Sequence, residues 1–246
     1  LHVLVLEAEH VGFGASGRNG GWVSALYPVS LDTLAASHGA PAAAAMGAAL
    51  RETVVEVGRV AEAERIDCDF HLGGTLIGAR TLAQVQRAQA GVSQGQRWDP
   101  QLQWLGPVEA AERVRMQGLL GASFYPSCAR VQPRRLVDGL AAAVRRLGGR
   151  IVEGVRVTQL GDHRVMVTDG AVVTTRHTVL ATEAWTATMP GRKRQVAPVY
   201  SLMIATEPLP ASVWDEIGLA GRETFADHRH VVIYGQRTAD DRIAFG

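Results

Sequence analysis

Two stretches near the start of the chain decide its fold: LHVLVLE at residues 1–7 and GFGASGRNGG at residues 12–21. The run Val3–Leu6 is apolar without alternation, a pattern typical of a strand in a parallel sheet that is covered on both faces. Glu7 ends this run, and the glycine-rich segment follows shortly after it. This order of strand, carboxylate and glycine segment predicts the beginning of an α/β domain with a parallel sheet.

The rest of the chain alternates helical and strand patterns. Pro133 opens a clear helical pattern, which Gly148-Gly149 ends as a left-handed C-terminal cap. Further helices are predicted at 31–66 and 82–96, and strands at 70–79, 119–125, 150–152, 177–181, 199–206 and 230–235. A small antiparallel meander is predicted over 155–160, 164–168 and 171–175, with turns at 161–162 and 169–170.

This order predicts an α/β fold, α+β overall, in which a Rossmann-type domain is interleaved with a β-rich second domain. The expected Rossmann-type domain takes residues 1–30 and 130–192, and the second domain takes 31–129 and 193–246. Because the chain starts within one strand pattern and stops within another, we expect an internal fragment that is truncated at both ends.

Composition narrows the class of protein. The formal net charge of +1, from 25 basic and 24 acidic residues, gives no reason to expect nucleic-acid binding, which needs a concentrated basic face. No stretch approaches the roughly 18 uninterrupted apolar residues of a membrane span, so none is expected. Cys68 and Cys128 are isolated from each other in sequence, which indicates reduced thiols and a cytoplasmic protein.

The glycine segment has two interpretations. Gly12–Gly17 spells GxGxxG after a strand, which taken literally is the fingerprint of an NAD-dependent dehydrogenase. Alternatively, Glu7 is the acidic residue that ends the second strand of a Rossmann unit and accepts hydrogen bonds from the adenosine ribose. The true fingerprint would then precede residue 1, and the later glycines would let the backbone approach a pyrophosphate.

The sequence gives weaker evidence for metal-binding, substrate-binding or catalytic residues. Asp227, His228 and His230 offer too few ligands at metal spacing, and no metal site is predicted. The tyrosines at positions 125, 200 and 234 could line a substrate pocket, although aromatic residues on strands are more often core. No residue is identified as a catalytic acid or base.

The sequence resembles the glycine and D-amino-acid oxidase family of FAD-dependent enzymes, and within it the gamma-glutamylputrescine oxidase-like branch. The string GASGRNGG at residues 14–21 carries most of this resemblance. The segments RRLVDGL at 134–140 and HTVLATEAW at 177–185 extend it, with Glu183 where the family usually has asparagine.

The resemblance implies which residues contact FAD. Glu7 would bind the ribose, Val155 the adenine, and Gly14, Ala15 and Ser16 the pyrophosphate and ribityl chain. Beside the isoalloxazine would lie Arg18, Asn19, Gly20 and Gly21, and Ala181 and Thr182 would face the cofactor at a strand end. Arg18 and Asn19 stand where some relatives carry a flavin-linked histidine, so non-covalent FAD is expected.

The resemblance also implies the reaction. Such enzymes oxidise a C–N bond of a small amine or amino acid to an imine, and oxygen or another acceptor reoxidises the flavin. In this arrangement residues 1–30 and 130–192 would bind FAD, and residues 31–129 and 193–246 would form the substrate domain. Two alternatives remain open: an NAD-dependent dehydrogenase, and an inactive remnant or partner-binding module.

Overall fold

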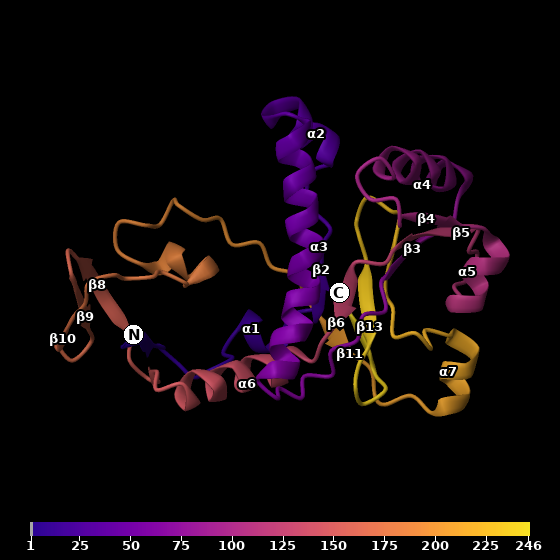
Figure 1. Ribbon diagram of the computed structural model, residues 1–246. Coiled ribbons are helices and arrows are strands. Elements are labelled where there is room, and N and C mark those ends of the chain that lie inside the picture. The colour runs from indigo at the N-terminus through magenta and orange to yellow at the C-terminus, as the bar shows by residue number, and fades with distance from the viewer. Residues whose placement is uncertain (1) are drawn as a thin grey trace. The chain divides into compact units, whose positions relative to one another are not determined.

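The computed structural model of the chain describes residues 2–246, which form two units that alternate along the sequence (Figure 1). Unit 1 consists of Leu1–Gly17 and Val137–Leu202. Unit 2 consists of Arg18–Leu136 and Met203–Gly246. Each unit therefore combines segments that are far apart in sequence.

A short parallel sheet organises unit 1. Strand β1 (Leu4–Leu6) pairs in parallel with β7 (Arg150–Val152), with Val5 opposite Ile151. Helix α6 (Pro133–Arg146) precedes β7 and gives way to Gly148, whose φ of 86° suits a residue without a Cβ. The predicted first strand, the helix after Pro133 and the strand at 150–152 are thus confirmed.

The predicted meander is also confirmed in unit 1. Strands β8 (Val157–Gly161), β9 (Arg164–Val167) and β10 (Val172–Thr174) pair antiparallel in the order β10-β9-β8. Val165 and Val167 of the central strand are buried, whereas the residues between and beside them are more exposed. This alternation is typical of a sheet with one covered face.

Four strand predictions were wrong in whole or in part. Of the predicted strand at 70–79, only β3 (Thr75–Ala79) forms. Residues 177–181 form no strand, and Val179 is 87% exposed. Of the predicted strand at 199–206, only β11 (Ile204–Ala205) forms. The predicted strand at 230–235 lies instead at β13 (Tyr234–Arg237). Short apolar runs show no periodicity that distinguishes a strand from an extended segment, which explains these errors.

Unit 2 is built on a seven-stranded mixed sheet with the order β11-β14-β13-β12-β3-β5-β4. The central strands β3 and β12 run parallel, with Thr75 opposite Thr224, and the other neighbours are antiparallel. The remaining strands of this sheet are β3 (Thr75–Ala79), β4 (Gln103–Leu105), β5 (Gly121–Tyr125), β12 (Thr224–Asp227) and β14 (Ile243–Phe245).

The two faces of this sheet differ. Helices α5 (Pro107–Arg113) and α7 (Ala211–Ile217) cover one face, where Leu76 and Trp214 belong to the main apolar core (Figure 1). A two-stranded ribbon of β2 (Trp22–Ser24) and β6 (Cys128–Arg130) lies on the other face, and Cys128 Sγ is 3.5 Å from Thr224 Oγ1. Both cysteines are buried thiols without a disulfide.

The helices of unit 2 differ in detail from the sequence prediction. The expected helix at 31–66 is two helices, α2 (Leu31–His38) and α3 (Ala40–Ala63), because Gly39 adopts a φ of 87° between them. The predicted helix at 82–96 is α4 (Leu82–Gly95), and its Ala88 and Val92 are buried. It therefore packs one face against the protein rather than standing free.

Candidate cofactor site

Two predicted site residues meet at the carboxyl ends of the parallel strands in unit 1. The N–H of Glu7 donates to the carbonyl of Val152 at 2.9 Å, and the N–H of Val155 donates to the carbonyl of Glu7 at 2.9 Å. These bonds prolong the β1–β7 pairing and place Glu7 beside Val155. The crevice outside the carboxyl ends of parallel strands is where open α/β sheets bind ligands.

A hydrogen bond from a backbone N–H two residues further along the chain orients the Glu7 carboxylate. Its Oε1 accepts a hydrogen bond of 2.9 Å from the N–H of Glu9, and Glu7 is half-buried. The Glu9 carboxylate in turn pairs with Arg156 at 2.8 Å, and the Glu9 carbonyl accepts from Gly154. Since an ionised carboxylate offers about four acceptor positions, Glu7 retains the capacity to bind a pair of hydroxyl groups.

The glycine segment does not have the structure of a dinucleotide fingerprint. Gly12 and Gly14 adopt φ values of 74° and 71°, and helix α1 (Ala15–Arg18) has only four residues. A Rossmann fingerprint opens the long crossover helix between two parallel strands. The geometry at Gly12–Gly17 therefore opposes the dehydrogenase interpretation.

Ring contacts bring a second predicted segment to this glycine loop. Phe13 and Trp185 have ring centroids 6.1 Å apart, and a Cβ on Gly14 would lie 3.6 Å from Trp185 Nε1. Trp185 belongs to the 3₁₀ helix η1 (Glu183–Thr188), for which Thr182 is the N-cap residue. Unit 1 thus gathers Gly14 and Thr182 in one region.

The details at Ala181 and Thr182 correct the prediction that they end a strand. Both precede η1 in irregular backbone, and Ala181 is exposed. The Thr182 hydroxyl lies 2.7 Å from the Thr186 hydroxyl, either of which could be the donor. Ala15 and Ser16, at the start of α1, are exposed as well.

The remaining predicted residues, at positions 18–21, belong to unit 2. Gly21 N–H donates to Asn19 Oδ1 at 2.8 Å, and Gln236 Nε2 donates to the carbonyl of Gly20 at 2.7 Å. Gly21 has a φ of 68°, and a Cβ there would overlap Gln236 Nε2 and the carbonyl of Val131. These two glycines therefore let the backbone lie directly on strand β13, whereas Arg18 is exposed.

Sequence reasoning missed Gln236 and the ring contacts around it. A Cβ on Gly20 would lie 2.7 Å from the Tyr234 ring, and Tyr234 meets Trp22 edge-to-face with centroids 5.9 Å apart. Tyr234 and Gln236 are two residues apart on β13 and share one face of the sheet. The sequence analysis had already named Tyr234, and a strand predicted at 234–237 would have placed Gln236 on the same face.

The other tyrosines have different surroundings. Tyr200 is 86% exposed in unit 1. Tyr125 lies in unit 2, where burial raises the pKa of its phenol. Neither belongs to the group of residues around Gly20.

His228 has a structural partner rather than a metal-binding one. Its Nε2 lies 3.1 Å from Ser123 Oγ on the sheet. Burial, and then the positive charge of Arg87, lower the pKa of His228, while Asp227 opposes them. Within residues 2–246, His, Cys, Asp and Glu side chains nowhere form a group of three that could hold a metal ion.

No helix within residues 2–246 has the length and apolarity to cross a membrane.

The unit 1 residues offer a chemically consistent set for a dinucleotide. A carboxylate at a strand end suits ribose hydroxyls, and backbone at glycines with positive φ suits close approach of phosphate oxygens. The adenine, ribose and pyrophosphate of FAD have these functional groups. The residues present in unit 1 therefore fit the adenosine half of this cofactor.

Comparison with known proteins agrees with this geometry. The sequence profile of the family described as FAD dependent oxidoreductase (DAO) matches residues 1–246. Gamma-glutamylputrescine oxidoreductase of Escherichia coli (strain K12) is 28% identical over 254 residues, which cover 99% of this chain and 58% of that protein. The chain thus spans somewhat more than half the length of this relative.

Solved structures share the fold. Glycine oxidase from Geobacillus kaustophilus superimposes with a TM-score of 0.72 at 21% identity, over 100% of this chain and 64% of that one. L-proline dehydrogenase from P. horikoshii gives a TM-score of 0.74 at 16% identity, over 100% and 63%. The mixed α/β architecture predicted from the sequence is confirmed by these likenesses. On the match of its whole length to the family profile, the chain belongs to the DAO family of FAD-dependent oxidoreductases.

Proposed function

We propose that this chain is part of an oxidoreductase that removes hydride from the carbon next to the nitrogen of a small amine or amino acid. The position of Glu7 beside Val155, at the carboxyl ends of β1 and β7, carries the proposal. The family match supports FAD as the cofactor. When bound, FAD accepts the hydride, and water then hydrolyses the imine product.

In this proposal residues of unit 1 bind the adenosine and pyrophosphate part of the cofactor. Glu7 accepts hydrogen bonds from the ribose hydroxyls, and the backbone at Val155 lies beside the adenine. Gly14, Ala15 and Ser16 present backbone to the pyrophosphate, and Ala181 with Thr182 faces the same cofactor from the start of η1. The family resemblance supports these roles, and the hydrogen bond from the N–H of Val155 to the carbonyl of Glu7 is consistent with the first two.

The family resemblance supports a second set of residues for the flavin ring, and we infer a third for the substrate. Beside the isoalloxazine would lie Arg18, Asn19, Gly20 and Gly21. The sheet face with Tyr234 and Gln236 would position the substrate.

Because residues 12–21 contain no histidine, we infer that FAD is bound without a covalent link. Two buried free thiols support a reducing, cytoplasmic setting.

The substrate class follows from the relatives. The three proteins compared above are named for gamma-glutamylputrescine, glycine and L-proline, which are all small amines or amino acids. We infer a substrate of this class for the present protein, with oxygen or another electron acceptor completing the cycle.

The absorption spectrum of the purified full-length protein tests the proposal. We expect flavin bands, which denaturation releases as free FAD if the link is non-covalent. Glu7→Gln should weaken FAD binding by roughly tenfold, because a charge-assisted hydrogen bond contributes about 1.5 kcal/mol or more. Glu52→Gln, an exposed change on α3, is the matched control. A colourless protein that binds NADH would contradict the proposal.

Turnover assays separate the enzyme from an inactive remnant. Release of peroxide, or reduction of an artificial acceptor, is expected with small amines or amino acids. A protein that holds FAD but is not reduced by any amine would support the partner-binding alternative.

A further inference from the structure

A buried arginine in unit 2 has more hydrogen-bond donors than partners. Arg130, on β6, is only 2% exposed, and its Nη2 pairs with Asp69. Its Nε and Nη1 have no hydrogen-bond partner. Buried guanidinium groups are normally fully hydrogen-bonded, because an unpaired buried charge loses its hydration without compensation.

Two further unpartnered atoms belong to the same polar layer between the ribbon and the large sheet. Trp22 is the register partner of Arg130, so both side chains leave the ribbon on the same face, and Trp22 Nε1 is buried without an acceptor. Gln236 Oε1, on the facing sheet, is buried without a donor. Several unmet groups in one layer indicate that something small and polar belongs there.

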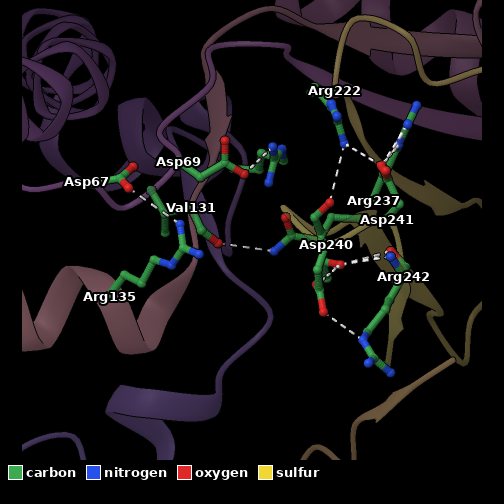
Figure 2. A network of polar contacts seen from close by, with 12 residues as sticks. Asp67, Asp69, Val131, Arg135, Arg222, Arg237, Asp240, Asp241 and Arg242 are labelled. Carbon is green, nitrogen blue, oxygen red and sulfur yellow. Dashed lines mark hydrogen bonds and ion pairs between the residues drawn. The ribbon is translucent and has the colours of Figure 1, made fainter. Parts of the chain in front are cut away.

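The arginines around Arg130 outnumber the carboxylates that pair with them. Arg222 and Arg237 share one carboxylate, Asp241, with Nη1–Oδ1 and Nη2–Oδ1 separations of 3.4 and 2.6 Å (Figure 2). With the Arg130–Asp69 pair, three cations therefore face two carboxylates. Burial is the main cause that lowers the pKa of Arg130, Asp69 opposes it, and Arg222 and Arg237 lower it further.

The other charged groups drawn in Figure 2 do not supply the missing negative charge. Asp67 pairs with Arg135 at 3.6 Å, and Asp240 pairs with Arg242 at 2.7 Å. Each of these pairs is neutral in itself. The cluster of Arg130, Arg222, Arg237, Asp69 and Asp241 therefore keeps one positive charge in excess.

Backbone conformation in this cluster is unusual as well. Asp69, Arg222 and Asp241 have φ values of 54°, 55° and 58°, in the left-handed region that residues with a Cβ disfavour. Such conformations persist where the surrounding structure requires them, and they concentrate at binding sites.

We propose that Arg130 and its neighbours Arg222 and Arg237 form a buried site for one small monovalent anion, of the size of a halide or formate. Water could satisfy the free N–H groups of Arg130, but only an anion also neutralises the excess charge. Nearly complete burial of Arg130 favours a small ion over a large organic one. The site lies wholly in unit 2 and is independent of the oxidoreductase assignment.

The test is the melting temperature of the full 246-residue chain at constant ionic strength. Chloride, bromide or formate replaces gluconate, a larger organic anion that serves as the reference. We expect a saturable rise of about 2 °C or more with each small anion, since a ligand that binds only the folded state stabilises it. If formate acts and halides do not, a carboxylate group is the natural occupant.

Two variants test whether the rise in melting temperature comes from anion binding at Arg130. Arg130→Lys keeps the charge but removes the fork of donors, and it should abolish most of the rise. Arg135→Met, in a neighbouring pair with 53% of the arginine side chain exposed, should leave the rise intact. No anion effect in the unmodified chain, or the same effect in Arg130→Lys, would overturn the proposal and leave the layer to water.

Crystals grown in bromide give a second readout that needs no variant. An anomalous peak within hydrogen-bond distance of Arg130 Nε or Nη1 is expected. Well-ordered water without anomalous signal at that position would contradict the proposal, even if Arg130→Lys failed to fold.

Discussion

The side-chain amide of Gln236 donates a hydrogen bond of 2.7 Å to the carbonyl oxygen of Gly20. The same Nε2 atom lies 3.4 Å from the carbonyl of Val131, so one side chain serves two backbone segments. Val131 N–H also donates to the carbonyl of Gly21 at 2.8 Å. Gln236 is 3% exposed, and no bulk water can replace it. The glycine segment at 20–21 is therefore fixed to strand β13 by a buried polar contact.

Gln236→Met should lower the free energy of unfolding by about 1–3 kcal/mol, because it leaves two carbonyls in a buried layer without their donor. Gln103→Met, at an exposed position of β4 in the same sheet, should change it by less than about 0.5 kcal/mol. Urea unfolding with unchanged m-values measures both. Equal effects of the two substitutions would show that the contact with Gly20 contributes nothing measurable.

Gly21→Ala should destabilise the chain by about 3 kcal/mol. Left-handed backbone costs an alanine about 1 kcal/mol, and the overlap of its Cβ with Gln236 and Val131 adds about 2 kcal/mol. Gly170→Ala separates these two causes, because Gly170 has a φ of 83° and open space around its Cβ position. Thermal melting of both variants measures the difference, and a Gly170→Ala variant as unstable as Gly21→Ala would contradict the steric argument.

The paired hydroxyls of Thr75 and Thr224 predict strong coupling between two substitutions. They lie 2.7 Å apart and are fully buried, and Thr224 Oγ1 also reaches the carbonyl of Gly74 at 3.3 Å. Thr224→Val leaves the buried Thr75 hydroxyl without its partner and should cost about 1–3 kcal/mol, whereas Thr75→Val should cost less because the Thr224 hydroxyl keeps the Gly74 carbonyl. The double variant should cost less than the sum by about 1 kcal/mol. Additive effects in a double-mutant cycle would show that the two hydroxyls do not interact.

Because of His228, we expect the free energy of unfolding to rise with pH in the neutral range. Its pKa is lowered in the folded protein, chiefly by burial and then by Arg87, with Asp227 opposing. Between the folded pKa and the unfolded value of about 6.5, the unfolded chain binds more protons. Acidification from about pH 7 should therefore lower the free energy of unfolding, and the loss should level off below the folded pKa.

His228→Gln should flatten this pH dependence, whereas His38→Gln, at an exposed position on α2, should preserve it. Denaturant unfolding at a series of pH values measures the slopes. The groups that face His228 are Ser123, Arg87 and Asp227, and Asp227 is itself paired with Arg229 at 2.6 Å. An unchanged slope in His228→Gln would assign the dependence to another group.

The sequence alone was sufficient for the elements whose signals are local. The apolar run before Glu7, the proline that opens α6 and the glycines that follow it each act through nearby backbone, and all were placed correctly. The meander was found for the same reason, since turns and alternation mark it. Glu7 and Val155 were named separately, and the pairing of β1 with β7 brings them together.

Features that depend on distant packing could not be predicted. Residues 177–181 have the composition of a buried strand, yet no described strand pairs with them, and pairing is not encoded locally. Gln236 contacts Gly20 across 216 positions of sequence, so no pattern near either residue announces the contact. The burial of Arg130 depends on packing between the ribbon and the large sheet, which no local pattern around position 130 indicates.

The alternation of the two units along the chain has a consequence for biosynthesis. Strand β3 leaves the ribosome before its parallel neighbour β12, which follows about 150 positions later, as the pairing of Thr75 with Thr224 shows. Until then one edge of the central strand has no partner, and exposed strand edges of partly made chains favour aggregation. The sheet of unit 2 therefore cannot be completed until residues 224–245 are translated, and pairing over so long a sequence separation slows folding.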